Sequence, residues 1–505
     1  MSPNYDEGTF AAYGATILKL ERKKDIVQYE SKLPITALNM LPRAIEQIVH
    51  PGLSKNNFED DVISGRYISL LAAIILGLVI YYWSKSLYGK SAGLMSLIFF
   101  LLCPNFLAHG IFLSSDIFAC LFTTLCFLFL WKFSKRQRSK DFVLMSLFTG
   151  LALISKFSMI HLVILVPILL LIDFLFLKNK TVGKNLNAKK TISLFFIFAG
   201  INWFIISAAH LFYGMFMPLN DYHFTSTTFQ SIQTALHSVG NYLFIPLPSS
   251  YIQSMDAVMH FDHIGGGVAG SLNGPPYISG TSSVNGFWYY YFVALFYKLP
   301  IPVLLLIFLT TILYLKKSGR KSFFEKEMYL LLPILYFLIY MNFFYSTQVG
   351  IRHIMMILPL LYIFFGFSFT NMNTTAATYS GIGLLAYQFI SVALYFPHFL
   401  PYTNEFILNK KMAYKKIADT NLCYGEGGVF LLDYLEKNKE AKYLPAKPEA
   451  GTIVMEVNEM LDLNIRTMGR YDWIKNFTPA DHIHSQYLIF EISTAQADSL
   501  QNVYP

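Results

Sequence analysis

Two adjacent carboxylates, Asp6 and Glu7, precede the first apolar segment of this sequence. A carboxylate close to a membrane surface can act as a general base that takes the proton of an acceptor hydroxyl group. Asp116 is a second acidic candidate at the start of an apolar segment, and His109 lies shortly before it. Ionisable groups at membrane depth are costly and usually functional. The plainer alternatives are a solvated acidic pair, a helix N-cap at Asp116 and a histidine that only forms hydrogen bonds.

Isolated cations form the second group of candidates. Lys156 and Arg352-His353 each interrupt a long, otherwise uncharged apolar stretch. Arginine binds phosphate through two hydrogen bonds and stays charged in a low dielectric, and a lysine can pair with a carboxylate or a phosphate. Lys298 and Arg66 are two further cations near the ends of apolar segments. The plainer alternative for these cations is snorkelling to the membrane interface.

The composition indicates a membrane protein. Hydrophobic residues make up 54% of the 505 residues and charged residues 14%, whereas soluble domains carry about a quarter charged residues. Most of the apolar segments approach the ~20 residues that cross a bilayer as a helix. We predict an all-α polytopic membrane protein with about ten transmembrane helices. The predicted spans are residues 67–84, 91–108, 116–133, 141–155, 158–177, 191–213, 290–315, 328–345, 351–369 and 378–397.

Clusters of lysine and arginine between the segments determine the predicted orientation. They occur at 132–140, 178–190 and 316–326, with a smaller cluster at 85–90. With ten spans these clusters fall on one side, which is predicted to be cytoplasmic. The acidic candidates and the isolated cations then lie on the outer side, against the positive-inside trend. This distribution suggests an anionic ligand that is reached from the membrane, such as a lipid phosphate.

Three regions are predicted on the basis of this topology. Residues 1–66 form a first extracytoplasmic loop with the acidic pair, and residues 67–397 form the transmembrane domain. Within that domain, the extracytoplasmic stretch 214–289 is too rich in glycine for regular helix. It could be a mobile lid or substrate loop, or a plain connector.

Residues 398–505 return to a soluble composition and are predicted to be a small extracytoplasmic α/β domain. A short helix is expected over 429–439. Short strands are expected over 452–455 and 487–490, because these stretches are apolar and rich in β-branched or aromatic residues.

Several classes of function are excluded by missing motifs. The sequence has no P-loop and no Rossmann glycine fingerprint, and its four cysteines lack metal-type spacing. The net charge of +8 comes from short loops between apolar segments and does not indicate a nucleic-acid partner. We therefore expect no nucleic acid, metal or cofactor. A transferase with an outer site would need an activated donor delivered within the membrane.

Short motifs occur along nearly the whole chain. Each motif alone is weak, but their joint order is specific. They are Pro3-Asn-Tyr-Asp6-Glu7 with Ala12-Tyr13-Gly14, Asn105-Phe-Leu-Ala-His109 with Ser115-Asp116, Gly150-Leu-Ala-Leu-Ile-Ser-Lys156-Phe, Gly286-Phe-Trp-Tyr-Tyr-Tyr-Phe with Lys298-Leu-Pro-Ile-Pro302, Gly350-Ile-Arg352-His353 and Phe396-Pro-His-Phe-Leu-Pro-Tyr-Thr-Asn404-Glu405. Together they resemble the bacterial branch of the protein O-mannosyltransferase and lipid A aminoarabinose-transferase group, integral-membrane glycosyltransferases with the GT-C fold.

The resemblance implies a multi-pass protein of the bacterial inner or plasma membrane with an extracytoplasmic active site. It implies a polyprenyl-phosphate sugar donor, inversion at the anomeric carbon, a protein, lipid or glycan acceptor, contact with membrane lipids, and no metal. Asp6 would be the catalytic base, and Glu7 and Asp116 would place the base or the acceptor. The leaving phosphate would be held by cations. The candidates for this role are Lys156, Arg352, His353, Lys298 and Arg66, and the matched motifs add His109 and Asn404 as further site candidates.

The sequence departs from the family pattern in two places. The resemblance implies one more membrane helix ahead of Asp6, so we expect an apolar segment upstream of it. After the last span, Asp419-Thr-Asn-Leu-Cys423-Tyr-Gly-Glu426 stands where bacterial relatives often have Asp-Ser-Asn-Leu-Asp-Trp-Gly-Gln. If this segment contacts the acceptor, acceptor choice differs from that of the relatives.

Two other functions remain open on the sequence. One is a transporter or flippase for a lipid-linked or anionic solute, whose charges should line a path through the bilayer midplane. The other is an inactive relative that serves as a scaffold. This alternative stays open because the sequence departs from the family pattern ahead of Asp6. Charges gathered at one surface favour the transferase.

Overall fold

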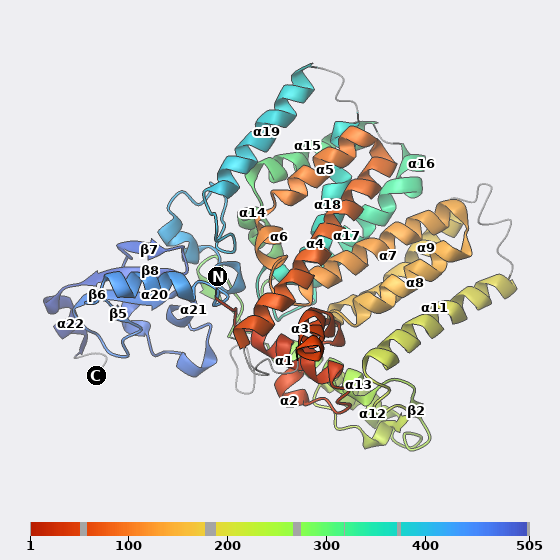
Figure 1. Cartoon of the computed structure of the whole chain (residues 1–505), viewed down its shortest axis with the longest axis horizontal. Coiled ribbons are helices and arrows are strands. Elements are labelled where there is room, and N and C mark those ends of the chain that lie inside the picture. Colours follow the sequence, from red (N-terminus) through yellow and green to blue (C-terminus); the bar gives the residue numbers. More distant parts are fainter. Residues whose placement is uncertain are drawn as a thin grey trace.

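The computed structural model describes residues 2–50, 58–176, 188–265, 274–317, 319–370 and 375–501. Most of these residues are helical, and the helices form one large bundle with a smaller part beside it (Figure 1). Much of the basic cluster predicted at 178–190 and the glycines at 266, 267 and 270 of the predicted loop lie outside the described residues.

Among the described residues, four helical segments are long and apolar enough to cross a membrane. They are α4 (Phe58–Tyr88), α7 (Asp116–Arg136), η2 (Phe157–His161) continued by α9 (Leu162–Phe176), and α11 (Ala188–Ala209). A fifth results if α14 (Tyr290–Lys298) and α15 (Ile301–Lys317), which are bent by 116°, count as one span. These helices identify an integral membrane protein, but they do not confirm the predicted number of ten spans.

Shorter elements account for the difference. They are α5 (Lys90–Leu101), α6 (Pro104–His109), α8 (Ser139–Leu153), α16 (Arg320–Ser322), the π-helical turn η4 (Phe323–Glu327), α17 (Met328–Phe343), η5 (Ile351–His353), η6 (Met355–Ile357), α18 (Leu358–Phe365), η7 (Gly366–Phe369) and α19 (Thr375–Ala393). Proline divides two predicted spans. Pro104 follows the break between α5 and α6, and Pro300 separates α14 from α15. Proline lacks the N–H group that a continuing helix needs.

The amino-terminal region, predicted as the first extracytoplasmic loop, contains several helices. It contains α1 (Glu7–Leu18), α2 (Ile26–Tyr29), η1 (Pro34–Thr36) and α3 (Ala37–Val49). Gly14 allows α1 to pack closely on η1, since a Cβ at this position would lie 2.6 Å from the carbonyl oxygen of Thr36. This close packing fixes the start of α1, where Asp6 and Glu7 lie.

The stretch between α11 and α14 contains more helix than the sequence predicted. Its elements are β1 (Met217–Pro218), η3 (Leu219–Asp221), α12 (Thr227–Ala235), β2 (Phe244–Ile245), α13 (Ser249–Ile264), β3 (Tyr277–Ile278) and β4 (Thr281–Ser282). The prediction of no regular helix is wrong for α12 and α13. The glycine-rich part of this stretch begins at Gly265, where φ is 76° and α13 ends, so it stops this helix without preventing it.

The carboxy-terminal part contains a four-stranded sheet in the order β5–β6–β8–β7. Its elements are η8 (Lys410–Lys415), η9 (Asp419–Asn421), α20 (Gly428–Lys437), β5 (Lys442–Tyr443), β6 (Gly451–Glu456), α21 (Val457–Met460), η10 (Ile465–Thr467), η11 (Asp472–Ile474), β7 (Asp481–Ile483), β8 (Tyr487–Ile492) and α22 (Thr494–Gln501). The predicted helix and both predicted strands are confirmed. Figure 1 shows this part beside the amino-terminal end of the chain.

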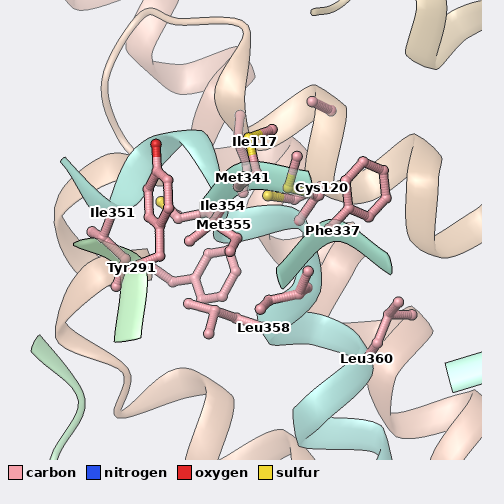
Figure 2. Close-up of a cluster of buried hydrophobic side chains, with 14 of the residues drawn as sticks. Ile117, Cys120, Tyr291, Phe337, Met341, Ile351, Ile354, Met355, Leu358 and Leu360 are labelled. Atoms are coloured by element: carbon pink, nitrogen blue, oxygen red, sulfur yellow. The ribbon is translucent and has the colours of Figure 1, made fainter. Parts of the chain in front are cut away.

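A buried apolar cluster lies where α7, α14, α17 and α18 converge (Figure 2). Ile117 of α7, Tyr291 of α14 and Phe337 of α17 are fully buried there, together with Ile351 and Ile354. The last two residues flank Arg352 and His353. Burial of its neighbours therefore fixes the backbone of this short segment, although it contains only 3-10 turns.

Candidate active site

A cavity of about 570 Å³ lies between the start of α1, the start of α7, η2, α13, the end of α17 and η5. Its lining has a charged part and an apolar part. The charged part contains Asp6, Lys32, Asp116, Lys156 and Arg352. The apolar part includes Phe157, Ile160, Met255, Val258, Met259 and Phe344. A third carboxylate, Asp262, also lines the cavity, and its Oδ1 accepts hydrogen bonds from the backbone amides of Ser346 and Thr347. The cations gathered around Asp6 and Asp116, next to an apolar part, suit an anion attached to an apolar chain.

The cavity lies at one end of the apolar helices. Asp116 is the first residue of α7, whereas Lys135 and Arg136 lie in its last turn. A helix of this length spans about 30 Å, which is close to the hydrocarbon thickness of a bilayer. The charged lining is thus separated from the basic residues by the whole length of the helix.

Asp6 lies at the centre of the charged part. Its Oδ1 accepts a hydrogen bond from Lys32 Nζ at 3.2 Å, and its Oδ2 accepts one from Arg352 Nη1 at 3.1 Å. The hydroxyl group of Tyr424 donates to the same Oδ2 at 2.5 Å. The side chain remains 28% exposed, so its carboxylate can meet a molecule that enters the cavity.

These partners determine the protonation of Asp6. Removal from bulk water alone would raise the pKa of Asp6, but the positive charges of Lys32 and Arg352, together with the hydrogen bond from Tyr424, outweigh this effect. The pKa of Asp6 is therefore held well below its ordinary value. The carboxylate is ionised at neutral pH, as a general base must be before it accepts a proton.

Lys156 connects two segments of the charged part. Its Nζ donates to Asp116 Oδ1 at 2.6 Å and to the backbone carbonyl of Arg352 at 3.1 Å. Both side chains of the ion pair are largely buried, which holds the ammonium group in place. His353 follows Arg352 and also lines the cavity, where its Nδ1 lies 3.1 Å from the hydroxyl of Tyr345.

Glu7, which the sequence placed beside Asp6 in the site, is absent from the cavity lining. Its fully buried carboxylate accepts hydrogen bonds from Arg66 Nε at 2.8 Å and Nη2 at 2.6 Å. The backbone amides of Asn4 and Leu113 also donate to it, each at 2.8 Å. Glu7 and Arg66 therefore join α1, α4 and the segment before α7, and the position of Asp6 depends on that junction.

Replacement of Arg66 with leucine should strongly destabilise the protein. It would leave the Glu7 carboxylate buried without its guanidinium partner, which typically costs about 3–5 kcal/mol. The thermal unfolding midpoint in detergent measures this loss. Lys437→Leu is the matched control, because Lys437 pairs with Asp433 at the surface and an exposed pair contributes about 0–1 kcal/mol. An unchanged midpoint for Arg66→Leu would contradict the assignment.

Three further candidates lie outside the cavity lining. Lys298 is buried and donates to the carbonyls of Leu400 at 2.5 Å and Asn421 at 2.8 Å. Asn404 is buried and donates to the carbonyl of Leu299 at 2.9 Å. His109 is buried beside the ring of Phe112. Their contacts assign them to the packing around the site, and Lys298 is held by carbonyls of the chain itself.

Two residues that contact Asp6, Lys32 in the cavity lining and Tyr424 behind it, were missed from the sequence. Lys32 belongs to a basic stretch that reads as an ordinary solvated surface. Its position is fixed by Lys24, whose buried Nζ donates to the carbonyl of Lys32 at 2.6 Å and to Ser254 Oγ of α13 at 2.7 Å. Tyr424 lies in the segment that departs from the family pattern, and that departure was the available signal. Among the described residues, no group of three or more His, Cys, Asp or Glu could hold a metal ion.

The fold and the cavity define the class: an integral membrane protein with a charged cavity at one end of its apolar helices. Residues 54–207 match the model of the dolichyl-phosphate-mannose-protein mannosyltransferase family. This segment includes α4 to most of α11, and it contains Asp116 and Lys156. The predicted resemblance to the group of GT-C membrane glycosyltransferases is thereby confirmed.

Solved structures of ArnT from Cupriavidus metallidurans are similar to this chain. One, bound to undecaprenyl phosphate, has 11% sequence identity and a TM-score of 0.48, with 93% of this chain and 71% of that chain covered. The other, in the apo state, has 10% identity and a TM-score of 0.31, with 97% and 93% covered. A search of curated protein sequences found no match.

Proposed function

We propose that this protein transfers a sugar from a polyprenyl-phosphate donor to an acceptor hydroxyl group on the extracytoplasmic side of the membrane, with inversion. One observation carries the proposal: Asp6 lies in a cavity whose charged part also contains Lys32, Lys156 and Arg352 and whose lining includes a separate apolar part. A phosphate would meet the cations, and the first part of the lipid chain would meet the apolar side chains.

The reaction follows from this arrangement. The acceptor oxygen attacks the anomeric carbon from the face opposite the phosphate, and the bond between that carbon and the phosphate oxygen breaks. Asp6 takes the proton of the acceptor hydroxyl group. Negative charge grows on the leaving polyprenyl phosphate, and Arg352 and Lys156 stabilise it. Asp116 holds Lys156 in position through the ion pair at 2.6 Å.

The low pKa of Asp6 fits this sequence of events. In the free enzyme Lys32 and Arg352 pair with Asp6 and reduce its basicity. A bound donor phosphate competes for the same two cations, so the pKa of Asp6 rises when the donor is in place. The base thus gains strength at the stage at which it is needed.

Replacement of Lys32 with methionine should move the acid limb of the kcat/KM profile to higher pH. The charge of Lys32 lowers the pKa of Asp6, so its removal raises that pKa, and protonation inactivates the base at a higher pH. The measurement is sugar transfer from about pH 8 down to about pH 2, so that the window extends below the ordinary carboxyl pKa. Lys23→Met, at an exposed position of the same basic stretch, is the matched control and should leave the limb unchanged. An acid limb that does not move would contradict the Lys32–Asp6 coupling.

Sugar transfer by the purified full chain tests the proposal directly. Polyprenyl-phosphate hexoses and pentoses serve as donors, and membrane extracts serve as acceptors. Transfer from at least one of these donors supports the proposal. Donor movement across vesicles without transfer would instead favour a transporter or flippase. Donor binding without either activity would favour an inactive relative.

A further inference from the structure

Tyr424 reaches the charged part of the cavity from the loop that precedes α20. Its hydroxyl donates to Asp6 Oδ2 at 2.5 Å, and Arg352 Nη1 donates to the same hydroxyl. The guanidinium carbon of Arg352 lies 4.6 Å from the centre of the Tyr424 ring. One side chain therefore contacts both the proposed base and a proposed phosphate-binding cation.

The backbones on either side of this contact are joined. The amide of Tyr5 donates to the carbonyl of Tyr424 at 3.0 Å, and the amide of Ser2 donates to the carbonyl of Glu426 at 3.1 Å. Gly425 has a φ of 88°, and a Cβ on it would lie 2.7 Å from the ring of Tyr5. Glycine permits both this conformation and this close approach. The segment that carries Asp6 thus lies directly against the loop that carries Tyr424.

Glu426 anchors the same loop in the carboxy-terminal part. One oxygen of its fully buried carboxylate accepts a hydrogen bond from the amide of Tyr424 at 3.0 Å. The other lies 2.6 Å from His398 Nε2 and accepts a hydrogen bond from the side chain of Gln486. Gln486, just before β8, also donates to the carbonyl of Leu422 at 2.8 Å. A buried network of this kind fixes a loop more firmly than its single bonds would.

We propose that Tyr424 is a positioning residue of the active site, held by Glu426, His398 and Gln486, so that the carboxy-terminal part supports Asp6 and Arg352 from behind the cavity lining. This inference rests on the proposed transferase function. When the donor phosphate takes up Arg352, the Tyr424 hydroxyl remains as the hydrogen-bond donor that orients the Asp6 carboxylate toward the acceptor.

Several ionisable groups act on Asp6 in addition to Tyr424. Lys32 and Arg352 contact it directly, and Glu30, His353 and Asp419 act on it at longer range. Burial raises the pKa of Asp419 to about 6, so Asp419 titrates in the range of an activity profile. Asp419→Asn therefore serves as a control that removes this second titration.

The test is Tyr424→Phe in the full chain, assayed for sugar transfer as a function of pH. Loss of a hydrogen bond to a charged group should lower kcat about 10- to 100-fold. The donor KM should stay nearly constant, and the acid limb of kcat/KM should move to higher pH, because the hydrogen bond from Tyr424 lowers the pKa of Asp6. Tyr443→Phe is the matched control: its hydroxyl donates to Glu456 at 3.2 Å in the same part of the chain, and it should change neither quantity.

A double mutant separates positioning from general stability. If Glu426 acts through Tyr424, then Glu426→Gln should shift the acid limb in the same direction, and the double variant should be no slower than Tyr424→Phe alone. Should Tyr424→Phe fail to fold, the shift in Glu426→Gln decides. If the wild type is active, either of two results would overturn this inference but not the proposed function. One is an unaltered pH profile in Tyr424→Phe, and the other is fully additive losses in the double variant. A wild type that transfers no sugar from any donor would overturn the proposed function and this inference with it.

Discussion

Asp6→Asn should reduce sugar transfer by about 10²- to 10⁴-fold, the range that general base catalysis contributes. Asparagine keeps the size and one oxygen acceptor of the side chain but cannot take the acceptor proton at neutral pH. The loss should fall on kcat. Donor binding should be unchanged or tighter, because Lys32 and Arg352 no longer pair with a carboxylate that competes with the phosphate.

The control for this variant is Asp433→Asn, which removes an exposed carboxylate that pairs only with Lys437 among the described contacts. It should be as active as the wild type. Elution as a single species in size-exclusion chromatography establishes that both variants are folded. Wild-type turnover in a folded Asp6→Asn protein would rule out Asp6 as the base, and another group would have to take the proton.

Arg352→Gln should have the second largest effect, a loss of about 10²- to 10³-fold in kcat, as expected when one preorganised donor to a developing negative charge is removed. The Arg352 side chain is 14% exposed and already lies beside Asp6, where the departing phosphate would be formed. A parallel fall in kcat and kcat/KM would show that the interaction forms in the transition state. Single-turnover kinetics with a saturating donor separate a loss of transition-state stabilisation from weaker donor binding.

Arg352→Lys distinguishes charge from geometry. Lysine keeps the positive charge but lacks the planar fork that reaches Asp6, stacks on Tyr424 and could also bind phosphate. We expect it to recover part of the activity lost in Arg352→Gln. Arg466→Gln, at an exposed position, is the control and should be neutral. Full activity in Arg352→Gln would remove this residue from the proposed mechanism.

Much of the fold follows from local patterns in the sequence. Apolar stretches of bilayer length predict spans because hydrocarbon demands internal backbone hydrogen bonding, and four such segments are found among the residues that the structure describes. Two of the four strands of the carboxy-terminal sheet, β6 and β8, were also predictable from their residues. The number of spans was not predictable in this way, because Pro104 and Pro300 divide apolar stretches that length alone would join.

The composition of the site was only partly predictable. Asp6, Asp116, Lys156, Arg352 and His353 stand out in the sequence because each is an ionisable group near or within apolar surroundings, and the structure brings all five to one cavity. Lys298 and Arg66 give the same signal but are held by partners inside the protein. A charge among apolar residues indicates that a partner exists, but it does not show whether that partner is a ligand or the chain itself.

The sequence by itself determined that this is a membrane protein with ionisable groups at the ends of its spans, because hydrophobicity and charge are properties of each residue and its neighbours. Only the tertiary structure decided which groups meet. Lys32 and Tyr424 contact Asp6 from 26 and 418 positions away. Such contacts depend on the packing of α1 on η1 and of the carboxy-terminal loop on the amino-terminal segment. No local pattern encodes them, since they arise from the close fit of distant surfaces.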